Sequence, residues 1–173
     1  VLLHTRVGTV AASGFAVMLA FYLLQQVGQP GVGFTAFQIK AWLVAKLLVA
    51  SLRIGLAHAY SRLGAENPAW PRWQAAMLAL LVVDGAVWGA AGWQMMGEPL
   101  PLAALAVAAL DGVSCVATFG LQVRLAATAA YVLPILLPTA FSLMWRCDGI
   151  AVLAGLGHLL LAGLALLTAR ATS

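Results

Sequence analysis

The chain has 173 residues, of which 64% are hydrophobic and only 8% are charged, and its net charge is +4. An ordinary soluble domain is about 25% charged, so this composition excludes a soluble globule and indicates an integral membrane protein. The positive charge requires no nucleic-acid partner, because basic residues that flank membrane spans are expected on the cytoplasmic side of the bilayer.

Six stretches of the chain are long enough to cross a bilayer, which takes about 20 consecutive apolar residues in a helix. In chain order these predicted spans are residues 8–27, 39–60, 73–96, 102–121, 124–145 and 150–168. Turn-forming residues separate them, most clearly at residues 28–31, Asn67-Pro68, 97–99 and 147–149. The predicted fold is therefore one all-α domain over residues 1–173, a bundle of six transmembrane helices embedded in a lipid bilayer.

The basic residues predict the orientation of this bundle. If the N-terminus is inside the cell, five basic residues lie at cytoplasmic ends of the spans and only two lie at external ends. The cytoplasmic set is Arg6, Arg62, Arg72, Arg124 and Arg170, and the external set is Lys40 and Arg146. By the positive-inside rule, this distribution places both termini in the cytoplasm.

Four ionisable residues fall inside predicted spans: Lys46, Arg53, Asp84 and Asp111. With a rise of about 1.5 Å per residue, Asp84 and Asp111 lie near the membrane midplane. A charged residue at that depth costs about 2.5–3.5 kcal/mol, so these side chains are expected to face the bundle interior and find partners. Lys46 and Arg53 are seven residues apart and share one helical face. We therefore expect a polar core in which the second span supplies cations to both carboxylates.

Two simpler interpretations stay open for these charges. Lys46 and Arg53 each lie within about 10 Å of an interface, so both long side chains are able to snorkel towards it. Asp84 and Asp111 are too short to snorkel, but they could join helices structurally without binding a ligand.

Three neighbouring residues complete the candidate ligand site. Trp88 follows Asp84 by one helical turn and is expected to line any cavity there, and Ser114 shares the face of Asp111. His158 lies near the midplane of the sixth span, where it either packs or contacts a ligand. No HxxxH or CxxC spacing accompanies it, so neither a metal site nor a cofactor is expected.

Glycine and proline mark the packing and hinge candidates. Gly85 and Gly89 form a GxxxG pattern that allows a neighbouring helix to approach closely. Pro134 and Pro138 interrupt the hydrogen bonding of the fifth span and free carbonyl groups that can face a cavity or a partner helix. No GxSxG, HExxH, P-loop or dinucleotide-binding motif occurs in the chain, so we do not expect this segment to be an enzyme.

Four short stretches form a distinctive set in the second, third and fifth spans and in the loop before the third span. They are Leu52-Arg53-Ile54, Pro71-Arg72-Trp73, Gly85-Ala86-Val87-Trp88-Gly89 and the stretch from Tyr131 to Pro138. Together they resemble bacterial six-helix membrane sensor domains of the MASE type, over about residues 40–170. The stretches Gly97-Glu98-Pro99 and Arg124-Leu125-Ala126-Ala127-Thr128 also resemble the membrane input of fatty-acid-signal sensor kinases.

The resemblance implies a function in signalling. MASE-type domains lie in the bacterial inner membrane, N-terminal to GGDEF diguanylate cyclase domains, often with EAL domains, or to histidine kinase modules. By this likeness the sixth span would continue into a cytoplasmic output domain beyond residue 173, and the assembly would be a homodimer. The input would be an unidentified small apolar or amphipathic ligand, or a change in the membrane.

Two other functions stay open from the sequence. A small proton-coupled carrier would use Asp84 and Asp111 as a relay. A structural anchor would use its buried charges only to fix helix register and dimerisation.

Overall fold

The computed structural model of the protein describes residues 2–63, 70–121 and 124–172. In this part of the chain every regular element is a helix, so the predicted all-α class with six helices is confirmed. The helices are α1 (Leu2–Gln26), α2 (Ala36–Leu63), α3 (Trp70–Met95), α4 (Leu100–Leu121), α5 (Leu125–Trp145) and α6 (Gly149–Thr172).

Each predicted span corresponds to one helix. The predicted and observed boundaries differ most at the start of the first helix and the end of the last. The start of α1 and the end of α6 extend beyond the apolar stretches, because a helix continues into polar residues that hydropathy does not count. The predicted break at Asn67-Pro68 and the turn at residues 122–123 lie outside the described residues.

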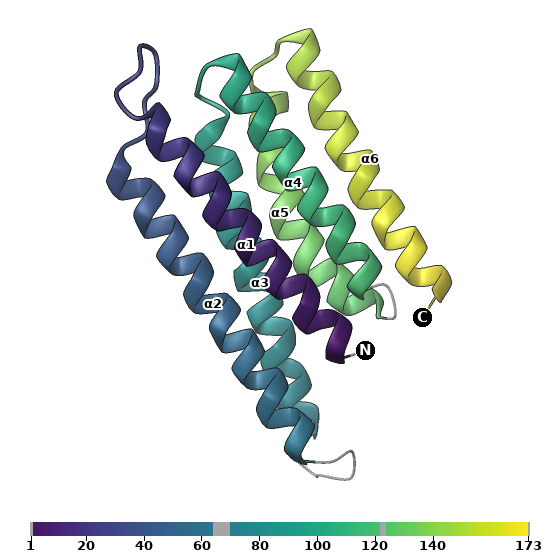
Figure 1. The fold of residues 1–173 in the computed structure, drawn as a ribbon. Helices are drawn as coiled ribbons and strands as arrows, with labels where there is room; N and C mark the ends of the chain where they lie inside the picture. The colour runs from purple at the N-terminus through teal and green to yellow at the C-terminus, as the bar shows by residue number, and fades with distance from the viewer. Residues whose placement is uncertain (1, 64–69, 122–123, 173) are drawn as a thin grey trace.

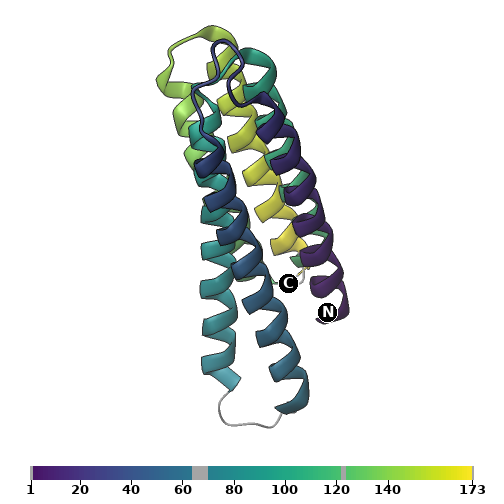
Figure 2. The same ribbon diagram turned by 60° about the vertical axis from the view of Figure 1, so that its left-hand side comes forward.

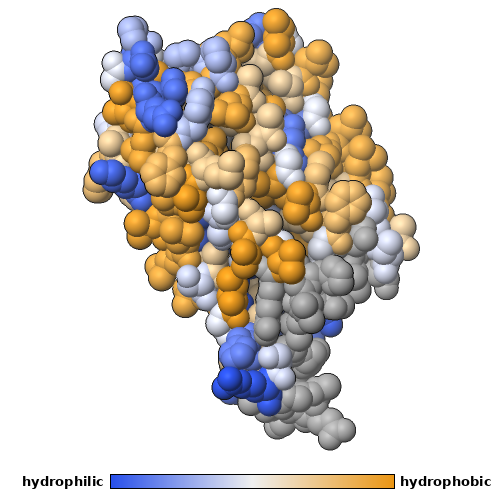
Figure 3. Space-filling model, in the orientation of Figure 1, coloured by the Kyte–Doolittle hydropathy of each residue, from blue (hydrophilic) through white to orange (hydrophobic). Residues whose placement is uncertain are grey.

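Five helices, α1 and α3 to α6, are long and apolar enough to cross a membrane. The remaining helix, α2, carries Lys40, Lys46 and Arg53 along its length. In Figure 3 an apolar surface covers most of the visible face, and hydrophilic residues gather mainly towards its two ends. This pattern is typical of a bundle whose outer face contacts lipid.

The helices run roughly side by side in an elongated bundle, and both termini lie at the same end of it (Figure 1, Figure 2). Helix α5 is central and packs against α3, α4 and α6, whereas α1 packs against α2 and α4. Helix α2 packs against α1 and α3. Helices α2 and α3 therefore meet along an interface that can pair their charges.

Helices α3 and α5 approach each other closely along the predicted glycine face. A Cβ at Gly85 would collide with the Tyr131 carbonyl, and a Cβ at Gly89 would overlap the carbonyl oxygen of Pro134. Pro138 has no N–H to bond that Pro134 oxygen, so the oxygen faces Gly89 instead. The predictions of a close approach at Gly85 and Gly89 and of a freed carbonyl facing a partner helix are confirmed, and α5 continues as one helix through both prolines.

The end of the bundle away from the termini is fastened by contacts between loops. The Gly33 amide donates a hydrogen bond to the Glu98 carboxylate at 2.9 Å, which joins the α1–α2 loop to the α3–α4 loop. The Arg146 guanidinium donates to the Met96 carbonyl at 2.6 Å and joins the end of α5 to the end of α3.

Candidate functional site

A buried ion-pair cluster lies at the interface of α2 and α3, with Asp84 at its centre. One carboxylate oxygen of Asp84 accepts a hydrogen bond from the Lys46 ammonium, and the other accepts from the Arg53 guanidinium. Lys46 and Asp84 are completely buried, and Arg53 is only 6% exposed. The predicted pairing of α2 cations with the α3 carboxylate is confirmed, and neither cation snorkels.

The seven-residue spacing on α2 explains how one carboxylate reaches both cations. Lys46 and Arg53 lie on one face, about 10 Å apart along the helix axis. Their long side chains converge on Asp84, and each of its oxygens receives one donor. The cluster therefore fixes the position of α2 relative to α3.

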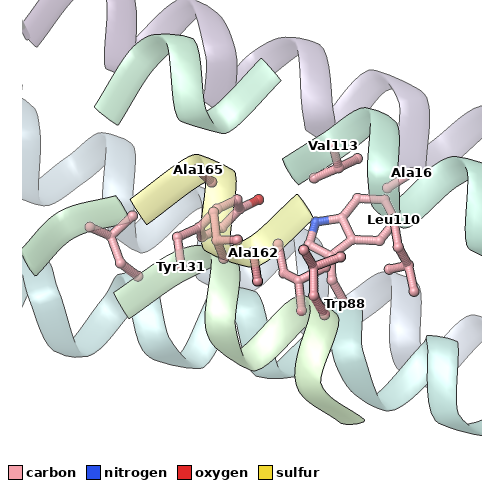
Figure 4. Packing of buried hydrophobic residues seen from close by; sticks show 11 residues of the cluster. Ala16, Trp88, Leu110, Val113, Tyr131, Ala162 and Ala165 are labelled. Carbon is pink, nitrogen blue, oxygen red and sulfur yellow. The ribbon is translucent and has the colours of Figure 1, made fainter. Parts of the chain in front are cut away.

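Aromatic rings cover both cations. The Lys46 nitrogen lies 5.4 Å from the centroid of the Trp88 ring, and the guanidinium carbon of Arg53 lies 5.4 Å from the centroid of the Tyr131 ring. Both distances fall within the cation–π range of about 6 Å. Figure 4 shows Trp88 and Tyr131 among the buried apolar residues of the core, so the cluster is enclosed by apolar packing.

Trp88 is itself held by two further aromatic residues. Phe15 of α1 stacks on it with ring centroids 6.3 Å apart, and Trp42 of α2 meets it edge-on at 5.3 Å. The Trp42 indole nitrogen also donates to the Val87 carbonyl at 3.0 Å. Trp88 thereby links three helices around the ion pairs.

By formal charge, the cluster holds two cations and one carboxylate. Among the described residues, Asp84 is the only carboxylate paired with Lys46 or Arg53, so two cations share one anion. The Nε atom of Arg53 is also buried without a hydrogen-bond partner. Buried charge without a counter-charge is costly, and an unmade hydrogen bond adds to that cost. The Arg53 guanidinium can thus still donate a hydrogen bond to a further acceptor.

A cavity of about 460 Å³ opens between α1 and α4 beside this cluster. Small and apolar side chains form most of its wall, and Arg53 and Tyr131 reach it from α2 and α5. The lining residues are Gly8, Thr9, Ala11, Ala12, Phe15, Arg53, Ala108, Ala109, Gly112, Val113, Val116, Ala117, Gly120, Leu121 and Tyr131. Its volume falls in the range of about 300–1,000 Å³ that is usual for small-molecule sites.

Trp88 does not line this large cavity, although the sequence suggested that it would line any cavity near Asp84. Trp88 lines a smaller one of about 50 Å³. Phe15 occupies the corresponding place in the large cavity, because its ring stacks on Trp88 from the α1 side. The aromatic residues in the wall of the large cavity are therefore Phe15 of α1 and Tyr131 of α5.

Asp111 belongs to a separate pair, and the expectation that α2 supplies its cation was wrong. Its carboxylate lies 3.5 Å from the Nε2 atom of His158 on α6, and its side chain is 38% exposed. The reason is rotational: Asp111 faces α6, which packs on α4, whereas α2 makes no close backbone contact with α4. The two midplane acids therefore do not form one polar core.

The Asp111–His158 pair is close but lacks hydrogen-bond geometry, and both facing atoms are buried without a hydrogen-bond partner. The other ring nitrogen of His158 lies 3.1 Å from the Ala154 carbonyl, which can only accept, so that nitrogen carries a proton. Ser114, one turn from Asp111, also has a buried hydroxyl without a partner. No group of three His, Cys, Asp or Glu side chains suited to a metal ion occurs in the described ranges.

Sequence reasoning missed the cavity and two of its residues, Phe15 and Tyr131. Tyr131 lay at the start of the stretch that carries the resemblance, but nothing marked its ring as a partner of Arg53. The available signal was the run of Gly and Ala on facing stretches of the first and fourth spans. In a chain this rich in both residues, that signal has little weight.

Comparison with known proteins does not assign the chain to a family: no protein-family model matches it, and neither does any curated protein or solved structure. The likeness to MASE-type sensor domains therefore stays a prediction, and the functional argument rests on the site itself.

Proposed function

We propose that this chain is the sensory input module of a bacterial inner-membrane signalling protein. It would bind a small apolar or amphipathic ligand in the cavity between α1 and α4. The bound state would bias the packing of the bundle and pass through α6 to a cytoplasmic output domain, a diguanylate cyclase or a histidine kinase. The working assembly is a homodimer with both termini in the cytoplasm.

One observation carries this proposal: Arg53 belongs both to the cavity wall and to the ion-pair cluster. An occupant of the cavity that contacts Arg53 changes the balance of the pairs between α2 and α3. Helix α3 packs tightly on α5, and α5 packs on α6, so a continuous path of contacts leads from the cavity to the last helix. Such a path supports a signalling role, and a change in signalling output would test it.

The carrier alternative has less support. It required Asp84 and Asp111 to act together as a relay, and each of them has its own partner on a different helix. The anchor alternative does not account for a large cavity with a buried cation in its wall.

A cavity-filling substitution tests the sensory function in the full-length protein. Gly112 lines the cavity, and a Cβ added there meets no atom within 4 Å, so Gly112→Leu fills the space without a clash at its Cβ. We expect the variant to give the same output under basal and stimulating conditions. Output is measured as cyclic-di-GMP synthesis or autophosphorylation in isolated membranes.

The matched control is Gly157→Leu on the exposed side of α6, where an added Cβ is equally free. It should leave basal and stimulated output at the wild-type level. A Gly112→Leu protein that reaches normal membrane levels and signals like wild type would contradict the proposed function.

A further inference from the structure

The large cavity has an elongated shape. Its α4 wall extends from Ala108 to Leu121, which corresponds to about 20 Å along the helix axis. Its α1 wall extends from Gly8 to Phe15 and consists mainly of small side chains. A long cavity with smooth apolar walls fits a chain-shaped apolar body.

The cavity wall carries a positive charge, which belongs to Arg53. Arg53 is the charged residue in the lining, it is more than nine-tenths buried, and its Nε has no hydrogen-bond partner. The cluster behind it holds two cations and one carboxylate, so one positive charge has no counter-charge among the described residues. In a low-dielectric interior, this excess attracts an anion far more strongly than it would in water.

We propose that the cavity binds a single-chain amphipathic anion, whose head pairs with Arg53 and whose aliphatic chain lies between α1 and α4. The bound head would supply the missing negative charge and accept a charge-assisted hydrogen bond from the guanidinium. This inference rests on the proposed function, because it names the ligand class for the same sensory cavity.

The chemistry of the cavity favours this class over its neutral and cationic counterparts. A neutral chain of equal length fills the apolar walls but leaves the excess charge of the cluster uncompensated. A cationic chain adds a like charge close to Arg53, which is unfavourable in a buried site. The head, rather than the chain, therefore sets the preference.

Equilibrium binding to residues 1–173 in phosphatidylcholine nanodiscs tests the inference. The probes are decanoate, decanesulfonate, decanol and decyltrimethylammonium, with empty nanodiscs as the background. We expect both anions to bind at least roughly tenfold more tightly than decanol, because hydrogen bonds to charged groups are worth more than neutral ones. The cation should bind most weakly.

Two substitutions identify the charge responsible. Arg53→Gln leaves the Lys46–Asp84 pair balanced, and Lys46→Met leaves the Arg53–Asp84 pair balanced, so each retains a paired cluster. Both should abolish the preference for decanoate over decanol, while decanol binding stays near the wild-type value. Lys40→Gln, an exposed position on the same helix, is the matched control and should keep the full preference.

Three results would overturn the inference: equal binding of decanoate and decanol to wild type, an unchanged preference in Arg53→Gln, or displacement of decanoate by phosphatidylglycerol added to the nanodiscs. The last result would assign the cavity to a two-chain lipid.

Failure of the proposed ligand class is distinguishable from failure of the proposed sensory function. Arg53-dependent binding of decanoate without any response of the full-length output would refute the sensory role alone, and an altered output in Gly112→Leu without anion binding would refute the ligand class alone.

Discussion

Asp84 and Lys46 contribute very differently to stability, although they belong to the same ion pair. Asp84 compensates two buried cations, whereas Lys46 is one of two cations that share a single carboxylate. Removal of one partner from a buried pair is costly because it leaves the other charge uncompensated. Removal of Lys46 instead leaves a balanced pair of Asp84 and Arg53.

We predict opposite outcomes for the two truncations. Asp84→Ala should lose about 3–5 kcal/mol of unfolding free energy, whereas Lys46→Met, which keeps the side-chain volume, should be neutral or stabilising. Thermal unfolding of the purified variants in one detergent measures both effects. A Lys46→Met protein that unfolds at a lower temperature than Asp84→Ala would refute this account of the charges.

The pairing of these charges could be predicted only partly, because the sequence does not show how each helix is rotated about its own axis. Spacing along α2 shows that Lys46 and Arg53 share a face, and depth shows which residues are level. Neither quantity fixes how a helix is turned relative to its neighbours. The carboxylate of Asp84 was therefore assigned to its correct partners, while Asp111 was assigned to α2 although it faces His158 on α6.

At the scale of helices, the α3–α5 interface depends on the absence of side chains. Gly89 faces the carbonyl oxygen of Pro134, and Gly92 faces Leu110 and Thr139. Gly85 and Gly89 thus lie opposite backbone carbonyls of α5, whereas Gly92 lies opposite side chains of α4 and α5. Without that space, the two helices would have to separate, and the path of contacts from α3 through α5 to α6 would weaken.

Two glycine-to-alanine substitutions should have effects of opposite sign. Gly89→Ala places a Cβ onto the Pro134 carbonyl, and we expect a loss of about 1–3 kcal/mol, as in other overpacked interiors. Gly157→Ala adds a Cβ where nothing lies within 4 Å, and it should gain about 0.5–1 kcal/mol because alanine favours the helix. Chemical unfolding in detergent micelles distinguishes the two. A stabilised Gly89→Ala protein would contradict the close approach.

The helices themselves could be predicted well, because length and hydropathy decide which segments can cross a bilayer. The GxxxG pattern and the prolines indicated two faces suited to close packing, and the fold brings these faces together. The cavity could not be predicted. It depends on the neighbouring positions of α1 and α4, which are far apart in the sequence, and on side chains that leave space unfilled.

At the scale of the whole molecule, the distribution of basic residues predicts its orientation. Arg62, Arg72, Arg124 and Arg170 belong to the end of the bundle that carries both termini (Figure 1). The opposite end holds Lys40 and Arg146 together with Glu98 and Asp148. The excess of basic residues at the terminal end is the reason to place it in the cytoplasm.

Reporter fusions after residue 173 test this orientation in bacteria. A green fluorescent protein should fluoresce there, and an alkaline phosphatase should be inactive, because it folds only in the oxidising periplasm. Fusions in the loop between α1 and α2, at residues 28–31, serve as the reciprocal control and should give the opposite pattern. An active phosphatase after residue 173 would invert the proposed topology.

The loop contacts at the far end of the bundle have a mechanical consequence. The bond between Gly33 and Glu98 holds the loop that follows α1, while the cavity lies nearer the N-terminal end of that helix. We therefore expect α1 to tilt about its C-terminal end, next to the loops, so that its N-terminal end moves most. About 30 Å separates Gly28 from Gly8, so a tilt of only about 5° moves the cavity wall at Gly8 by about 3 Å. An occupant of the cavity that tilts α1 by this small angle would therefore move the N-terminal part of α1 by a similar distance, at the end of the bundle that also holds the C-terminal end of α6.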